Sequence, residues 1–116
     1  METIIIPTNK GLRLCNTNNI IRIQAMGNYS RIYFADNSYP LTIAKLLHWF
    51  EEQSPAGIFW RTHKTHLVNS LYVKQLPTSQ RHYLILKNGE TVAVSRRRVA
   101  KGLLYKKSPG QDGSPQ

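Results

Sequence analysis

Two short clusters of basic residues in the second half of the chain offer the clearest chemistry in this sequence. The first cluster consists of Arg61, His63 and Lys64. The second places four cations within six residues: Arg96, Arg97, Arg98 and Lys101. Guanidinium groups clamp phosphates or read the O6 and N7 atoms of guanine in the major groove of DNA. In such clusters most residues contact phosphates and one or two read bases. The clusters therefore predict a nucleic-acid-binding surface.

The charge is also distributed unevenly along the sequence. The 116 residues hold 16 lysines and arginines against six aspartates and glutamates, a net charge of +10. Residues 1–58 contribute only +1, residues 59–107 hold eleven basic residues and one acid, a net of +10, and residues 108–116 contribute −1. A surface that only keeps a protein soluble would mix both signs. The distribution indicates an anionic partner: DNA, RNA, an acidic protein or a membrane surface.

Catalysis and metal binding find little support in the sequence. Glu51 and Glu52 are adjacent and would point apart on a helix, a poor geometry for a catalytic pair. His63 and His66 form an H-x-x-H motif, but no third ligand pattern accompanies them. The sequence has neither a Gly-rich phosphate-binding loop nor a Gly-x-Ser-x-Gly motif. We expect a protein that is not an enzyme and has no catalytic residue, metal, cofactor or small-molecule substrate.

Composition also bears on the compartment. Cys15 is the only cysteine, so no internal disulfide is expected, and its alternating apolar surroundings predict a small buried side chain. No apolar run approaches the roughly 18–20 residues of a membrane-spanning helix. The N-terminus lacks the pattern of a signal peptide. We therefore expect a cytoplasmic protein without a membrane partner.

The elements that must position the basic clusters are mostly strands. The β-branched run that begins at Thr3 predicts a strand ended by Pro7, and apolar alternation predicts strands over 12–15, 20–25, 29–35, 71–76, 82–86 and 91–94. Alternation places Ile21 and Ile23 on one face of their strand. Asn88-Gly89 predicts a type I′ hairpin turn. Strands in hairpin order indicate a mainly β fold of small antiparallel sheets.

One medium helix and one short C-terminal helix complete the prediction. The medium helix spans Thr42–Gln53, with Thr42 as its N-cap and an apolar stripe toward the core formed by Ile43, Leu46, Leu47 and Phe50. Ser95 is the predicted N-cap of the short helix, Arg96–Leu104. A single helical turn is predicted over His66–Asn69. The segment 105–116, basic and then rich in Gly, Ser and Pro, is predicted to be a disordered tail.

Three ordered motifs give the sequence a specific resemblance. They are IRIQAMGNYS at residues 21–30, FWRTHKTHLVN at residues 59–69, and LKNGE at residues 86–90 followed by VSRRR at residues 94–98. In this order and spacing they closely resemble the LytTR family, bacterial DNA-binding domains usually fused behind a receiver domain of a two-component system. The resemblance spans roughly residues 3–104, and we expect residues 1–104 to form one such domain.

The resemblance implies an elongated fold that inserts loops into successive major grooves on one side of the duplex. Family members typically bind direct repeats upstream of promoters and regulate transcription. Carried over by position, the residues implied to contact bases are Asn28, Tyr29, Ser30, Lys64 and Arg97. Those implied to contact phosphates are Arg61, His63, Arg96, Arg98 and Lys101. Asn69 is expected to brace its loop rather than to touch DNA.

Two departures and two alternatives stay open at this point. Gln24 stands where the family commonly has an acid, and no receiver domain precedes the motifs, so phosphorylation-driven dimerisation is not implied even if a homodimer forms on DNA. One alternative is an RNA-binding module, in which Tyr29 would stack on a base. The other is a protein-interaction domain that docks on an acidic partner.

Overall fold

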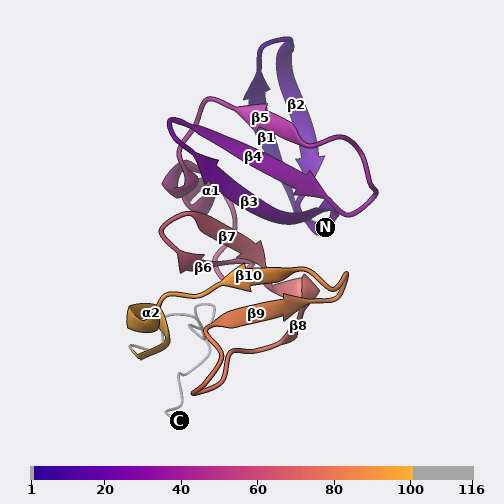
Figure 1. Cartoon of the computed structure of the whole chain (residues 1–116). Coiled ribbons are helices and arrows are strands. Elements are labelled where there is room, and N and C mark those ends of the chain that lie inside the picture. The colour runs from indigo at the N-terminus through magenta and orange to yellow at the C-terminus, as the bar shows by residue number, and fades with distance from the viewer. Residues whose placement is uncertain (1, 101–116) are drawn as a thin grey trace.

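The computed structural model describes residues 2–100, which form ten short strands, two α-helices and two 3-10 turns (Figure 1). The strands are β1 (Thr3–Thr8), β2 (Gly11–Asn16), β3 (Ile20–Met26), β4 (Tyr29–Phe34), β5 (Leu41–Ile43), β6 (Phe59–His63), β7 (His66–Asn69), β8 (Val73–Gln75), β9 (Tyr83–Leu86) and β10 (Thr91–Ala93). The helices are α1 (Leu47–Gln53) and α2 (Arg96–Ala100), and the 3-10 turns are Thr17–Asn19 and Ser70–Tyr72. The predicted mainly β fold is confirmed.

The strands form three antiparallel sheets. A five-stranded sheet has the order β5-β4-β3-β7-β6, and a three-stranded sheet has the order β10-β9-β8. The two-stranded sheet β1-β2 lies beyond β5 at the other end of the molecule (Figure 1). Every pairing is antiparallel, as hairpin order predicted. The molecule is elongated, with extents of 45 × 30 × 25 Å.

Two hydrophobic cores hold these sheets together. The larger core lies between the five-stranded sheet, the β1-β2 hairpin and α1, and includes Ile23, Ile32 and Phe50. The smaller core joins β7 to the three-stranded sheet through Val68, Leu84 and Val92. A β-bulge between Ile20 and Arg22 turns the side chain of Ile21 to the smaller core, whereas Ile23 enters the larger one. The prediction that Ile21 and Ile23 share a face is therefore wrong, because a bulge breaks the two-residue period.

The medium helix is shorter than predicted. Residues 41–43 are not its first turn but strand β5, which pairs with β4, and Leu46 rather than Thr42 is the residue before the helix. Leu47 and Phe50 are buried, whereas Leu46 is 46% exposed. Ile43 reaches the same core from a strand. A helical spacing of apolar residues therefore arose here across a strand and a helix that share one core.

Several local predictions also need correction. Residues 66–69 form strand β7, not a helical turn, because β7 fills the place between β3 and β6. Pro7 does not end the strand: it lies within β1 and pairs with Leu12. Its missing N–H is tolerated because β1 pairs with β2 alone and no further strand needs a donor from it. The predicted strand over 71–76 is limited to Val73–Gln75, because the preceding residues form a 3-10 turn.

The β9-β10 hairpin uses a turn that differs from the predicted one. Gly89 has a φ of +89°, but Asn88 does not have a positive φ, so a type I′ turn is excluded. The Gly89 N–H donates to Leu86 O at 2.9 Å, and the Leu86 N–H donates to Glu90 O at 2.8 Å. This is the pattern of a three-residue loop with a glycine bulge. Asn88 still shapes the turn, because its Oδ1 accepts from the Glu90 N–H at 2.9 Å.

Three buried or capping residues behave as predicted. Asn69 is 2% exposed, its side chain donates to Thr17 O at 3.0 Å and Ile20 O at 2.9 Å, and its Oδ1 accepts from the Leu71 N–H at 2.9 Å. Ser95 caps α2, since its Oγ accepts from the Arg98 N–H at 3.2 Å. Cys15 is buried. Residues 101–104 of the predicted short helix and the predicted tail 105–116 lie outside the described residues.

Candidate nucleic-acid interface

Two hairpin turns lie together at one end of the five-stranded sheet. The β3-β4 turn is formed by Gly27 and Asn28, and the β6-β7 turn by Lys64 and Thr65. β7 pairs antiparallel with β3, so the beginning of β7 lies beside the end of β3. The Ala25 N–H donates to Thr65 O at 2.9 Å, which ties the second turn to the strand that leads into the first.

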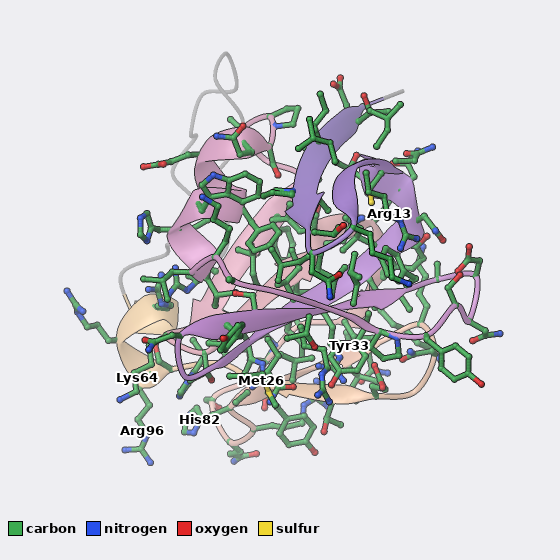
Figure 2. The ribbon with its side chains drawn as sticks, turned by 90° about the horizontal axis from the view of Figure 1, so that it is seen from above. Arg13, Met26, Tyr33, Lys64, His82 and Arg96 are labelled. Carbon is green, nitrogen blue, oxygen red and sulfur yellow. The ribbon has the colours of Figure 1, made fainter. Side chains whose placement is uncertain are left out.

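The start of α2 joins the same side of the molecule. The Ser95 N–H donates to Thr62 O at 2.9 Å, so the helix begins next to the last residues of β6. Figure 1 shows the β3-β4 turn, the β6-β7 turn and α2 one below another along the left side of the molecule. Figure 2 shows Lys64 and Arg96 pointing outward on the same side. The fold thus brings together three segments that are far apart in the sequence.

The β3-β4 turn presents two of its predicted base-contacting residues and hides the third. Gly27 has a φ of +65°, a conformation that favours glycine and allows a two-residue turn. Asn28 is exposed and Tyr29 is 52% exposed. Ser30 is fully buried, and its Oγ donates to Lys45 O at 2.6 Å. The side chain of Ser30 therefore fixes the strand to the segment after β5 and does not reach the surface, where its predicted base contact would be made.

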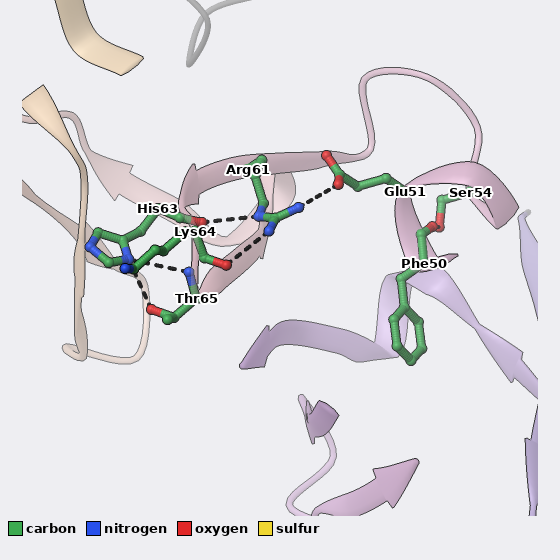
Figure 3. A network of polar contacts seen from close by, with 7 residues as sticks. All are labelled: Phe50, Glu51, Ser54, Arg61, His63, Lys64 and Thr65. Carbon is green, nitrogen blue, oxygen red and sulfur yellow. Dashed lines mark hydrogen bonds and ion pairs between the residues drawn. The ribbon is translucent and has the colours of Figure 1, made fainter. Parts of the chain in front are cut away.

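The β6-β7 turn is organised by Arg61 (Figure 3). The Arg61 Nε donates to His63 O at 3.0 Å, and its Nη2 donates to Lys64 O at 2.8 Å. Its Nη1 donates to Glu51 Oε1 of α1 at 2.6 Å. The guanidinium therefore holds two carbonyls of the turn while a carboxylate anchors it from outside. Arg61 is committed to the protein rather than to phosphate, which differs from its predicted role.

His63 is likewise part of the turn. Its Nδ1 accepts from the Thr65 N–H at 3.2 Å and lies 2.9 Å from Thr65 Oγ1. Because Nδ1 acts as the acceptor within the turn, Nε2 is the ring nitrogen left to donate to a partner. Lys64, at the tip between them, is exposed. The segment in which Arg61 and His63 were expected to contact phosphates and Lys64 a base is thus a shaped loop that exposes Lys64 at its tip.

His66 faces His63 across the hairpin, with ring centroids 5.8 Å apart. Its Nδ1 is buried without a hydrogen-bond partner. Burial, followed by the charges of His63 and Arg22, lowers the pKa of His66 below its ordinary value. His66 is therefore neutral at pH 7, and protonation would place a cation beside two other basic groups.

The arginines of α2 differ in exposure. Arg96 and Arg97 are exposed, whereas Arg98 is partly buried. Burial and the nearby charge of Arg61 lower the pKa of Arg98. Lys101, a predicted phosphate contact, lies outside the described residues.

Sequence reasoning missed two acids that pair with arginines: Glu51, which contacts the β6-β7 hairpin, and Glu90, which lies in the β9-β10 hairpin away from the three segments. Glu51 pairs with Arg61 over ten residues of sequence, and Glu90 accepts from Arg22 Nε at 3.1 Å over 68 residues. The Arg22 hydrogen bond is the largest cause of a lowered pKa for Glu90. The Arg22 guanidinium also lies 3.9 Å from the centroid of the Tyr33 ring. No sequence signal marks such pairs, because each joins different elements.

The described residues contain no group of three or more His, Cys, Asp or Glu side chains placed to hold a metal ion. Among the same residues, no helix is long and apolar enough to cross a membrane. The exposed ends of the three segments instead offer lysine, arginine, asparagine and tyrosine side chains. These are groups that hydrogen-bond phosphates and base edges.

Comparison with known proteins agrees with this chemistry. The family model described as the LytTr DNA-binding domain matches residues 10–103. A solved structure from Bacillus cereus, the LytTr DNA-binding domain of a methyl-accepting/DNA response regulator, is similar at 21% sequence identity with a TM-score of 0.71. The match covers 90% of this chain and 97% of that chain, and it identifies the same fold. No curated protein matches the sequence.

Proposed function

Because this chain belongs to the LytTR family of DNA-binding domains, we propose that it recognises a specific double-stranded DNA sequence and regulates transcription. In this proposal the β3-β4 turn, the β6-β7 turn and α2 enter successive major grooves on one side of the duplex. A DNA-binding domain is not a catalytic fold, which agrees with the expectation of a non-enzyme. The proposed site of action is the bacterial cytoplasm, where the DNA is.

The observation that supports this proposal most is the alignment of the three segments along the long axis. Each is exposed at its tip, and each offers a side chain that can reach a base edge: Asn28 or Tyr29, Lys64 and Arg97. The molecule is 45 Å long. One turn of B-DNA is about 34–36 Å long. A domain laid along the duplex can therefore reach more than one groove on the same face.

The contacts are proposed to divide into base reading and backbone binding. We assign base reading to Asn28, Tyr29, Lys64 and Arg97. Arg96, Arg98 and Lys101 are proposed to contact phosphates. His63 keeps an Nε2–H that can donate to phosphate while Nδ1 holds the turn. Arg61 supports Lys64 from behind through the carbonyls of the turn.

Arrangement on promoters is a further part of the proposal. A single domain reads a short site, so two copies on direct repeats would double the contacts. Binding as a homodimer on DNA would follow from the spacing of the repeats rather than from contacts between the copies.

The experiment is a selection from a random duplex pool followed by fluorescence anisotropy at several salt concentrations. The proposal predicts enrichment of one motif whose preference over random duplex persists as salt rises. Steeply salt-dependent binding without enrichment would contradict sequence-specific recognition. Tighter binding to single-stranded RNA than to the best duplex would favour the RNA-binding alternative, with Tyr29→Ala as the variant that tests stacking.

A further inference from the structure

We propose that a hollow beside the β3-β4 turn binds a phosphodiester of the DNA backbone, as a fourth contact beyond the three segments described above. The inference rests on the proposed function, because it extends the same DNA face toward the β1-β2 hairpin. It assigns a role to Lys45 and Lys10, which belong to neither of the basic clusters.

The hollow is formed by three separate segments. It has a volume of about 450 Å³ and is lined by residues 7–9 at the end of β1, by Tyr29, and by residues 42–45 after β4. The hydrogen bond from Ser30 Oγ to Lys45 O, 2.6 Å long, fixes the last of these segments to β4. Tyr29 lines the hollow and follows Asn28 directly, so the hollow lies beside the β3-β4 turn.

The charge of the hollow suits a phosphodiester. Lys45 lines it, and Lys10 is exposed in the adjoining β1-β2 turn. None of the residues that line it is acidic. The Lys45 Nζ lies 5.4 Å from the centroid of the Trp49 ring, a cation–π contact that leaves the charge of the ammonium in place.

The β1-β2 turn is preorganised for such a contact. The Thr8 Oγ1 donates to Gly11 O at 2.6 Å and accepts from the Lys10 N–H at 3.0 Å. Gly11 has a φ of +109°, which only glycine adopts readily. Lys10 is therefore carried on a turn whose backbone is already fixed, so less ordering is lost on binding.

The size of the hollow matches one backbone unit. Small-ligand sites usually measure about 300–1,000 Å³. A hollow of about 450 Å³ accommodates a phosphate with part of its sugar, and Tyr29 is among the residues that line it. The contact would carry no sequence information and would fix the register of the domain on the duplex.

The test compares the whole chain with Lys45→Gln and Lys10→Gln on the selected duplex and on duplexes shortened by about five base pairs from either end. Lys45→Gln is expected to weaken binding to the full duplex about 3- to 10-fold and to lower the slope of log Kd against log salt concentration by about 1. Lys10→Gln is expected to act in the same direction. On the duplex shortened at the end next to the β3-β4 turn, wild type and variants should bind equally.

Lys87→Gln is the matched control. Lys87 is an exposed lysine in the β9-β10 turn, which lies at the opposite end of β10 from α2. Lys87→Gln should change the affinity for each duplex by less than twofold. Lys45→Arg should retain wild-type affinity, and thermal unfolding checks that each variant is folded.

Two results would overturn the inference. One is unchanged affinity for Lys45→Gln on the full duplex, and the other is the same loss on the full duplex and on both shortened duplexes. Failure of the wild-type chain to prefer any duplex is a different result, seen without variants, and it would contradict the proposed function itself.

Discussion

At the residue scale, the interface contains two kinds of side chain: some are exposed and free to contact DNA, and others hold the backbone that carries them. Arg97 and Lys64 are exposed, whereas Arg61 and Ser30 donate hydrogen bonds to backbone carbonyls. The motifs in the sequence located all four residues. The supporting roles of Arg61 and Ser30 could not be predicted, because Glu51 and Lys45, which hold them in place, lie on segments that only the fold brings close.

Arg97→Ala tests base reading at one position. We expect a loss of about 1–3 kcal/mol on the preferred duplex and a relaxed preference at one base pair, because a guanidinium reads guanine with two hydrogen bonds. The measurement is anisotropy on a set of single-base variants of the selected site. Lys87→Ala is the control. Equal loss on every variant would instead indicate a phosphate contact.

Arg61→Met tests whether Arg61 stabilises the β6-β7 turn that carries Lys64. The substitution removes three hydrogen bonds, two of which hold carbonyls of the β6-β7 turn. We expect DNA binding to fall by about tenfold or more because the turn that presents Lys64 loosens, with a salt slope that changes little. A salt slope lowered by about 1 would show that Arg61 itself binds phosphate.

Glu51→Gln removes the carboxylate charge that pairs with Arg61 and leaves the hydrogen bonds from Arg61 to the carbonyls of the turn in place. Glu51 and Arg61 form an ion pair whose side chains are 37% and 21% exposed, so the pair contributes little in water. DNA affinity is expected to change by less than about threefold, and urea unfolding should detect at most a small loss of stability. A loss of DNA affinity as large as that of Arg61→Met would mean that the ion pair with Glu51, rather than the carbonyl contacts, determines how well Arg61 holds the turn.

At the element scale, the hairpins that bear the tips were predictable and the start of α1 was not. Alternation in residues 29–35 marks β4 because Ile32 and Phe34 face the core. The same apolar content at Ile43, Leu47 and Phe50 suggested one helix, although a strand and a helix share it. Periodicity reports which residues are buried, and it distinguishes the elements only where one element is long enough.

The β6-β7 hairpin should respond to pH through His66. Its pKa is lowered in the folded state, so the unfolded chain binds the proton first as pH falls. The contribution to stability is therefore complete above about pH 6.5, the ordinary pKa of histidine. It declines below that pH by at most about 1.4 kcal/mol per pH unit.

Urea unfolding between pH 7.5 and 5.5 measures this decline. His66→Gln should flatten the pH dependence, whereas His48→Gln, at an exposed position on α1, should leave it as in the wild type. A decline that persists in His66→Gln would assign the effect to another group. Glu90, whose pKa is lowered by Arg22, acts in a lower window, because its contribution is lost only as pH falls below its ordinary value.

At the scale of the whole molecule, one side is fixed by buried polar contacts and the other is left open for a partner. Asn69 ends β7 at the end of the sheet opposite the two turns, and it joins β7 to the segment before β3. Its bracing role was expected from the resemblance of the motif at residues 59–69 to the LytTR family. The sequence did not predict the two separate cores or the bulge at Ile21, because both depend on how the sheets pack against each other.

Asn69→Ala tests this brace. The substitution leaves two buried carbonyls and one N–H without their partners, so we expect a loss of about 2–4 kcal/mol of unfolding free energy. Urea unfolding measures it, with exposed Asn9→Ala as the control. A loss below about 0.5 kcal/mol would show that solvent or a local shift replaces the brace.

The most direct test of the central claim is a hydroxyl-radical footprint of the chain on its selected duplex. If the three segments contact successive grooves from one side, protection should appear in patches about one helical turn apart on a single face of the DNA. Arg97→Ala should remove protection at one patch only, because α2 lies at one end of the line of contacts. Protection on all faces, or protection confined to less than half a turn, would contradict this arrangement.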